Sequence, residues 1–565
     1  MVKEYQSLKV TISQIGDKLF RSRADRFPRG ASVGAGHDFK LDLETFRPFL
    51  RALRSRSVSP PTALEDFGRD LFDRVFTDSV RDRYSEVREA ARRQEHEFRI
   101  CLSIQALDLV SLPWELLHDG SGFLAREHGY AIVRVIDELQ GTKSSFGHVE
   151  HVLVAAANPA DGYDRFDADA HLAALKTNLT KAHKTFEIVY PASKKAIRDA
   201  LKADRFDAFY FVGHGVHMAS GGRLVCQRQE SDGAEELESG ALAGWLREAH
   251  RMRVVYLNAC SSAAHSTGES PFYGVAQRLM LDGDVAAVVA MPIDIPQAAA
   301  LPMAESFFEE MTQASPEDAV LKMRRDAEGE GDWAIPVVYS YVDAPEQFEK
   351  NCLAALVGAS ATDDCELVVP SFVKAVPRGE DPLPFDSKGR YIFPGETFAR
   401  SDIQAALSVR DLLIQVVPAA RIKLVPQHEW KWEGKTNLFL FGSKSNPAVS
   451  SVLREFSNRF KFHYERDRWT IIDAERGLQY SMQAPHQLSP GAYSDTEDFG
   501  VIQKLSAAGE PTKFVIAGLG SRATEGCGRY LTDNWRRLLN EFGQKAFAIV
   551  LRFAPGLGTR SDRVG

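Results

Sequence analysis

Two short segments join a strand-like apolar run to a residue type that can do chemistry. Phe209-Tyr-Phe-Val-Gly-His-Gly-Val-His217 runs into Gly-His-Gly, with His214 between the glycines. Val254-Val-Tyr-Leu-Asn-Ala-Cys-Ser-Ser262 runs into a turn of small residues that contains Cys260. The histidine and the cysteine are 46 positions apart, which leaves room for a strand–helix–strand unit that could bring them together.

A thiol beside an imidazole can attack a carbonyl group. A free thiol with a pKa of about 8.5 is mostly protonated at neutral pH, and the thiolate is the nucleophile. The imidazole of His214 would take the proton from Cys260 and pass it to the leaving amine. The N–H groups of Gly215 and Cys260 are candidates for holding the oxyanion, because both are expected in loops at one edge of a sheet.

Each residue alone also fits a structural role. A cysteine after an apolar strand is commonly a small buried side chain, and a histidine between glycines can be a hydrogen-bonding turn residue. His217 and His265 could compete for the role of base, but the flanking glycines favour His214. The occurrence of both residues on neighbouring strands favours catalysis, because the carboxyl ends of strands in α/β sheets collect ligands and chemistry.

The surrounding pattern predicts the elements that position this pair. Residues 62–98 are predicted to be helical, and an alternating strand follows. From about residue 148, apolar strands alternate with amphipathic helices, which is typical of an α/β unit with a mostly parallel sheet. Strands are expected near 151–157, 186–190, 208–212, 253–257 and 285–290, and helices near 167–184, 193–203, 240–249, 273–281 and 298–312.

Composition excludes several classes of protein. The chain has 565 residues, 44% hydrophobic and 26% charged, with a net charge of −8. Such a composition is typical of folded proteins and argues against general nucleic-acid binding. No apolar run of about 18 residues and no signal-peptide pattern occur, so we expect a cytoplasmic protein without membrane contact. The six cysteines form no Cys-x-x-Cys pair, which disfavours a zinc ribbon and fits free thiols.

Roughly residues 60–345 resemble the CHAT family of caspase-like cysteine peptidases. This family is related to caspases, separases and gingipains. The motifs are Val212-Gly-His-Gly and Leu257-Asn-Ala-Cys-Ser-Ser. Supporting segments are Leu112-Pro-Trp-Glu-Leu-Leu, Val152-Leu-Val-Ala-Ala-Ala-Asn-Pro, Val288-Val-Ala-Met-Pro and Trp333-Ala-Ile-Pro-Val-Val-Tyr. The resemblance implies a catalytic dyad at His214 and Cys260, with no metal and no cofactor.

The resemblance and the pattern together predict an α/β fold with four segments. These are an N-terminal buttressing half (1–147), a caspase-like peptidase half with a mostly parallel sheet (148–345), a linker with a short helix (346–430) and a separate Rossmann-like α/β domain (431–565). The Pro113-Trp114-Glu115 segment is equally compatible with core packing, and we interpret it as structural.

Acidic residues near the expected strand ends are candidates for contacting a basic substrate side chain. Asp161 and Asp294 are the main candidates, and Asp282 and Asp284 could act in the same way. All four also fit roles as turn or cap residues.

Two glycine-rich turns follow apolar strands in the C-terminal part. Gly442 and Lys444 lie in the first turn, and Gly518, Gly520 and Arg522 lie in the second. Each turn precedes an expected helix whose N-terminal N–H groups favour anions. Tight α/β turns need glycine in any case, and neither turn is a P-loop. A limited similarity to Rossmann-like domains appended to prokaryotic defence and signalling proteins suggests a sensor.

The leading hypothesis is therefore a caspase-like cysteine endopeptidase that cuts a protein substrate and is gated by its C-terminal domain in a prokaryotic defence or stress response. An activating ligand or partner protein would bind that domain, and an oligomer is compatible with the sequence. One alternative is a catalytically idle scaffold whose C-terminal domain binds a nucleotide-type ligand and drives assembly. Another is a nucleotide-processing enzyme acting at the glycine-rich turns.

Overall fold

The computed structural model describes residues 4–27, 35–58, 62–136, 147–218, 221–261, 271–292, 295, 297–311, 314–327, 331–341, 344–373, 396–431, 434–443, 446–456, 459–465, 468–482, 496–505, 511–556 and 558–565. The chain divides into two compact units, Val2–Glu349 and Lys350–Gly565. The division lies close to the predicted end of the peptidase half at residue 345.

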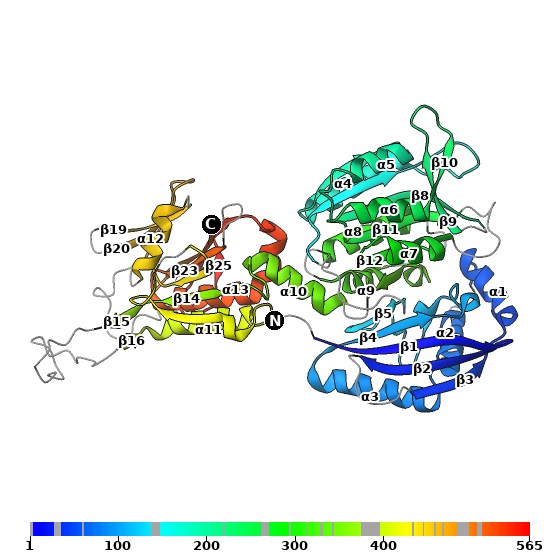
Figure 1. Ribbon diagram of the computed structural model, residues 1–565, viewed down its shortest axis with the longest axis horizontal. Helices are drawn as coiled ribbons and strands as arrows, with labels where there is room; N and C mark the ends of the chain where they lie inside the picture. The colour runs from blue at the N-terminus through cyan, green and yellow to red at the C-terminus, as the bar shows by residue number, and fades with distance from the viewer. Residues whose placement is uncertain are drawn as a thin grey trace, which may run out of the picture. The chain divides into compact units, whose positions relative to one another are not determined.

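The first unit is built on one thirteen-stranded sheet (Figure 1). Its main path runs β10-β9-β8-β11-β12-β13-β5-β4-β1-β2-β3, with β6 paired to β7 and β8. The strands are β1 (Tyr5–Gly16), β2 (Leu19–Phe27), β3 (Ala35–Lys40), β4 (Glu97–Ile104), β5 (Tyr130–Arg134), β6 (His151–Ala156), β7 (Thr185–Val189), β8 (Ala208–Met218), β9 (Gly221–Gln227), β10 (Ala234–Glu238), β11 (Val254–Ser261), β12 (Ala287–Ala290) and β13 (Val337–Ser340).

The direction of the strands explains how the two predicted halves join. Strands β7, β6, β8, β11 and β12 pair in parallel, as expected from alternating strands and helices. Strand β13 pairs antiparallel to β12 and parallel to β5. The predicted halves 1–147 and 148–345 therefore share a single sheet, and the expected α/β fold with a mostly parallel, helix-flanked sheet is confirmed.

Helices cover both faces of the sheet of this unit (Figure 1). Helix α4 packs on α8 and α8 on α9, whereas α6 packs on α7, which contacts β8, β9 and β12. The helices of the unit are α1 (Leu43–Arg54), α2 (Thr62–Val75), α3 (Asp78–Gln94), α4 (Ala168–Lys181), α5 (Lys194–Leu201), α6 (Ser239–Glu248), α7 (Pro271–Asp282), α8 (Gln297–Glu310) and α9 (Pro316–Asp326). The single helix predicted over 62–98 is two helices, because Thr77 is extended and starts α3 as its N-cap.

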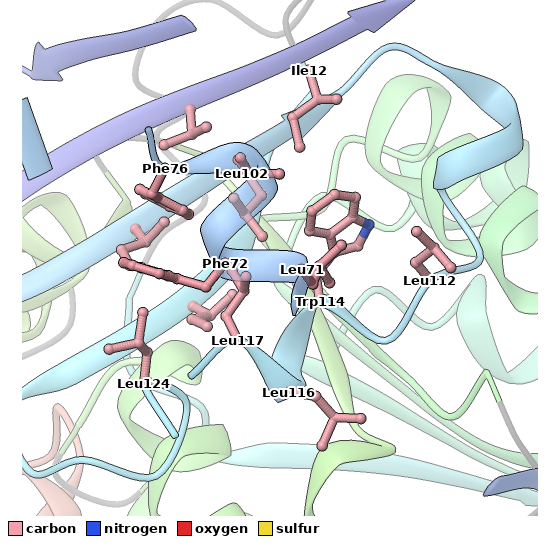
Figure 2. Packing of buried hydrophobic residues seen from close by; sticks show 14 of the residues in the cluster. Ile12, Leu71, Phe72, Phe76, Leu102, Leu112, Trp114, Leu116, Leu117 and Leu124 are labelled. Carbon is pink, nitrogen blue, oxygen red and sulfur yellow. The ribbon is translucent and has the colours of Figure 1, made fainter. Parts of the chain in front are cut away.

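The N-terminal part has its own hydrophobic core, in which Trp114 lies fully buried among Leu71, Phe72 and Leu102 (Figure 2). The indole N–H of Trp114 donates to the carbonyl of Leu109 at 2.8 Å. This satisfies the one polar atom that the ring brings into the core.

Glu115, next to this tryptophan, is also buried and serves the fold. Its carboxylate accepts two hydrogen bonds from the guanidinium of Arg134, at 2.8 and 3.1 Å. Arg134 also donates to the carbonyls of Val110 and Leu112. The structural interpretation of the Pro113-Trp114-Glu115 segment is thus supported by its contacts.

The second unit contains a seven-stranded sheet in the order β17-β14-β18-β23-β22-β24-β25. Strands β17, β14, β18 and β23 are parallel, and the other pairs are antiparallel. Its elements are β14 (Cys365–Val369), β15 (Ser371–Val373), β16 (Glu396–Phe398), α11 (Arg400–Leu413), β17 (Ile422–Pro426), β18 (Asn437–Phe441), α12 (Pro447–Glu455), β19 (Phe460–Glu465), β20 (Arg468–Asp473), β21 (Gln479–Ser481), β22 (Asp498–Leu505), β23 (Lys513–Gly518), α13 (Ser521–Phe542), β24 (Phe547–Phe553) and β25 (Asp562–Arg563), and α10 (Ala344–Val357) spans the division between the units.

The predicted linker over 346–430 is wrong. Strands β14 and β17 come from this segment and pair with each other, and β14 pairs with β18. Helix α11 packs on α13. The apolar strand at 365–369 is short and borders a Pro- and Gly-rich stretch. For this reason the sequence pattern did not predict it as a strand. With three antiparallel strands at one side of its sheet, the unit is a mixed α/β domain, and the Rossmann-like resemblance is not confirmed.

Within the described ranges, no helix combines the length and the apolar character that crossing a bilayer requires.

Candidate active site

The register of two neighbouring parallel strands places His214 beside Cys260. Strands β8 and β11 pair without interruption from Ala208↔Val254 to Gly215↔Ser261, and Cys260 is the register partner of His214. Neighbouring strands lie about 4.8 Å apart. The predicted convergence of the two positions on adjacent strands is therefore what the backbone shows; the side chain of Cys260 lies outside the described part of the structure.

The strands extend further than the sequence suggested. His214 and Gly215 were expected in a loop, but β8 continues to Met218 because β9 replaces β6 as its partner on that side. Gly215 pairs with Leu224 of β9 on one side and with Ser261 of β11 on the other. Its N–H therefore points at a neighbouring strand on either side. This counts against the predicted role of the Gly215 N–H in holding the oxyanion. The N–H of Cys260 is the other candidate for that role.

Close packing explains why residue 213, the first position of the Gly-His-Gly motif, is a glycine. A Cβ atom at this position would lie 2.9 Å from the carbonyl oxygen of Ala157 and 3.1 Å from the ring of Phe211. The carbonyl belongs to backbone that cannot move independently, since the N–H of Ala157 donates to Val212. Glycine is needed here because the end of β6 approaches β8 closely.

The His214 ring is covered by an aromatic side chain that the sequence did not reveal. His214 is 5% exposed. The ring of Tyr163, in the loop after β6, stacks on the imidazole with centroids 5.2 Å apart and planes inclined by 29°. No spacing rule links position 163 to position 214; the contact exists because the loop leaves β6 at the edge where His214 lies.

A buried polar network lies on the same strands. Asn258 Nδ2 donates to the hydroxyl of Tyr210 at 2.8 Å, and this hydroxyl lies 3.0 Å from Nε2 of His171 on α4. Burial lowers the pKa of His171 to about 4, so the ring is neutral near pH 7. The network joins both strands of the candidate dyad to a helix and satisfies three polar groups that would otherwise be costly to bury.

The acidic candidates are placed differently from one another. Asp161 is exposed and lies in the same loop as Tyr163, so it shares the edge of the sheet with His214. Asp282 pairs with Arg278 one turn earlier on α7. Asp282 and Asp284 precede β12 and thus lie at the amino ends of the parallel strands, opposite the edge with His214, so these two are wrong as substrate contacts. Asp294 and His265 lie outside the described residues, as does the side chain of His217.

The second glycine-rich turn of the C-terminal unit is filled by a side chain of the protein. The carboxylate of Asp498 accepts N–H donors from Gly520 and Ala523 at the start of α13, both at 2.9 Å. A Cβ at Gly518 would lie 2.4 Å from the N atom of Thr524. Arg522 donates to the carbonyls of Thr496 and Phe553. These contacts explain the glycines and the arginine by tight packing, and Asp498 takes two of the N–H groups that an anion at this helix start would need.

The first glycine-rich turn is also tied into the fold. Gly442 has a φ of +81°, which favours glycine. Ser443 donates from Oγ to the carbonyl of Gly518 at 2.7 Å, and Asn446 caps α12 through the N–H of Ala448. Lys444 lies outside the described residues. The described atoms of this turn thus have roles in the fold, and a ligand there stays a prediction.

Residues 65–332 match the sequence model of the CHAT domain family. This part of the chain is a CHAT domain. The matched residues include the strands that carry His214 and Cys260, and the predicted resemblance to the CHAT family is confirmed for this part of the chain. No curated protein matches the chain.

Three solved structures have a distant likeness to this chain. The Saccharomyces cerevisiae separase–securin complex matches at 15% identity and a TM-score of 0.29, over 46% of this chain and 17% of that chain. The Arg-specific cysteine proteinase gingipain R matches at 12% and 0.31, over 51% and 72%. The Drosophila initiator caspase Dronc matches at 10% and 0.24, over 36% and 83%. At these values the likeness by itself establishes no shared mechanism.

Proposed function

We propose that the CHAT domain is a cysteine endopeptidase in which Cys260 is the nucleophile and His214 is the general base and acid. The observation that carries this proposal is the register of β8 and β11, which makes the two residues direct neighbours. A lone cysteine or histidine would not support catalysis. A thiol and an imidazole on adjacent strands support it, because the carboxyl ends of parallel strands meet at one edge of the sheet.

The chemistry balances with these two side chains and water. The imidazole takes the thiol proton, and the thiolate attacks the carbonyl carbon of the scissile amide, forming a C–S bond. The C–N bond breaks as the imidazolium gives its proton to the leaving amine. Water, deprotonated by the imidazole, then attacks the thioester, releasing the carboxylic acid and the thiol. Asp161, exposed on the neighbouring loop, is the candidate for contacting a basic substrate residue.

The C-terminal unit is proposed to gate this activity in a prokaryotic defence or stress response, with a protein as substrate. Its separate compact fold supports a role distinct from catalysis. A nucleotide-type ligand at the turn after β23 is disfavoured, because Asp498 occupies the N-terminus of α13. As the activating signal, we therefore favour a partner protein or another ligand of the C-terminal unit over a nucleotide at that turn.

A thiol-reactive peptidyl probe tests the peptidase. Full-length protein should form a covalent adduct at Cys260, found by mass spectrometry of the digested protein. Cys260→Ala should abolish labelling, and His214→Gln should reduce its rate by about 10²–10⁴-fold. Cys226→Ala is the matched control, because this thiol on the neighbouring β9 is buried and burial raises its pKa. Labelling that survives Cys260→Ala, or that ignores His214→Gln, would contradict the assignment.

A further inference from the structure

The loop between β6 and α4 places Tyr163 against His214. The proposed mechanism, which uses only His214 and Cys260, does not involve this contact. Tyr163 is half-buried, and its ring is stacked on the imidazole at a centroid distance of 5.2 Å. The tyrosine covers the one ring that changes its protonation state in the proposed mechanism.

The loop that carries Tyr163 is closed on itself by Asn158. Its side-chain Nδ2 donates to the carbonyl of Phe166 at 2.8 Å, and its Oδ1 accepts the N–H of Phe166 at 3.3 Å. Both polar atoms of one buried amide thus hold the two ends of the loop together. Seven residues from Pro159 to Arg165 are spanned by this clamp, with Tyr163 among them.

The same loop is docked on the β9–β10 hairpin. The N–H of Asn158 donates to Oε1 of Gln227 at 3.2 Å, and the N–H of Ala160 donates to the carbonyl of Asp232 at 2.8 Å. Arg165 donates to the carboxylate of Asp232 at 3.0 Å, and Gln227 Nε2 donates to the same carboxylate at 3.3 Å. Since β9 also pairs with β8 at His214, the hairpin holds the tyrosine and the histidine in one frame.

An aromatic face has two physical effects on a neighbouring imidazole. It restricts the rotation of the ring about its χ2 bond, and its negative quadrupole stabilises a cation placed against it. The acidic groups around the loop do not substitute for this effect: Asp232 is paired with Arg165, and Glu236 of β10 is paired with Arg223 at 2.6 Å. Asp161 is exposed on the loop itself.

We propose that Tyr163 is a positioning residue of the peptidase: its ring fixes the plane of the His214 imidazole and stabilises the imidazolium that pairs with the Cys260 thiolate. The proposal rests on the proposed function, because it assumes that His214 and Cys260 act together. It adds a third side chain, from the loop after β6, to the site.

The test measures the alkylation rate of Cys260 by iodoacetamide between pH 5 and 9, in full-length protein, by mass spectrometry. Wild type and Tyr163→Phe, which keeps the ring, should give the same profile. In Tyr163→Leu, the acid limb should move to higher pH by about 0.5–1 unit, because the thiolate–imidazolium pair loses its support. At pH 6 the rate should then fall about 3- to 10-fold. With a peptide substrate, kcat should fall and KM should stay unchanged.

His214→Gln separates the failures. If His214→Gln changes the profile and Tyr163→Leu leaves it superimposed on the wild type, only the role of Tyr163 is overturned. If His214→Gln itself leaves the profile unchanged, the thiol–imidazole pair fails and both proposals are overturned. Tyr163→Met serves as a second ring-free variant should Tyr163→Leu not fold, and denaturation midpoints equal to wild type establish that the loss is local.

Discussion

At position 213 the fold accepts only a glycine, and this single fact sets the path of the residue after it. The carbonyl of Ala157 and the ring of Phe211 leave no room for a Cβ atom. The backbone of β8 can therefore run close to the end of β6 and bring His214 under the loop that carries Tyr163. The glycine acts on the candidate catalytic residue through packing and not through chemistry.

Gly213→Ala should reduce peptidase activity and stability together. The added methyl group meets backbone at 2.9 Å, and overpacking of this kind costs about 1–3 kcal/mol. The free energy of unfolding by urea and the labelling rate of Cys260 check both effects. Gly244→Ala on α6, where a Cβ meets nothing within 4 Å, is the matched control and should leave both unchanged or raise stability slightly. Equal behaviour of the two variants would refute the packing argument.

His171 makes the stability of the protein dependent on pH. Burial lowers its pKa to about 4, from the ordinary value near 6.5. Between these values the unfolded chain binds a proton that the folded chain does not, so this contribution to stability is complete above pH 6.5 and is lost as the pH falls. The loss by pH 5 should be about 2 kcal/mol.

His171→Gln keeps a hydrogen-bonding group for the hydroxyl of Tyr210 but has no titrating ring. Urea unfolding between pH 6.5 and 5 should therefore show a shallower decline of stability in His171→Gln than in the wild type. Parallel declines would mean that other groups control the acid sensitivity.

At the scale of elements, the N-terminal N–H donors of α13, which resemble an anion-binding site, are bound by a side chain of the protein itself. The helix starts at Ser521 after Gly520, and such a start exposes N–H donors that attract anions. Asp498, at the beginning of β22, supplies the carboxylate. Burial raises the pKa of Asp498, and the N–H donors of Ala523, Gly520 and Phe499 oppose this rise.

Asp498→Ala should destabilise the C-terminal unit, since removing a capping acceptor costs about 0.5–2 kcal/mol. Asp498→Asn keeps one acceptor oxygen and should cost less. Hydrogen exchange of the first turn of α13 localises the effect. Because the carboxylate already satisfies these donors, added nucleotides should leave the hydrogen exchange of this turn unchanged in the wild type. Slower exchange of the turn with rising nucleotide concentration would instead restore a nucleotide-type ligand at this position.

At the scale of the whole molecule, one sheet unites residues that the sequence pattern separates into halves. Strand β13 joins the two parts, because it pairs with β12 on one side and β5 on the other. A buried ion pair and a hydrogen bond support the junction. Arg99 lies 3.7 Å from Glu317 of α9, and Glu317 also accepts a hydrogen bond from Ser340 of β13 at 2.5 Å. The strands that carry His214 and Cys260, and the described contacts of His214, lie within the first unit.

A chain ending at Glu349 should fold and, if the C-terminal unit gates the site, should cleave protein substrates without an activating signal. The measurement compares cleavage of a substrate library by this chain and by the full chain, with Cys260→Ala in both as control. Cleavage by the shorter chain only, or much faster cleavage by it, is expected. Equal cleavage by both chains would refute gating while leaving the peptidase assignment intact.

Local patterns in the sequence predicted much of the α/β unit over 148–345, but not β9, β10 and α9. Apolar runs and 3.6-residue periodicity predicted α4 to α8, and strand ends in a parallel sheet predicted the pairing of His214 with Cys260. These features depend on neighbours in the chain or on a general rule of sheet topology, so the sequence by itself determined them.

The tertiary structure alone decided which side chains surround the candidate dyad. Tyr163 reaches His214, and Asp498 reaches the start of α13, across separations that follow no period. Strand β14 joins the C-terminal sheet from within a segment that looked like a linker. Such contacts arise when loops and strands pack in three dimensions, and a one-dimensional pattern carries no record of them.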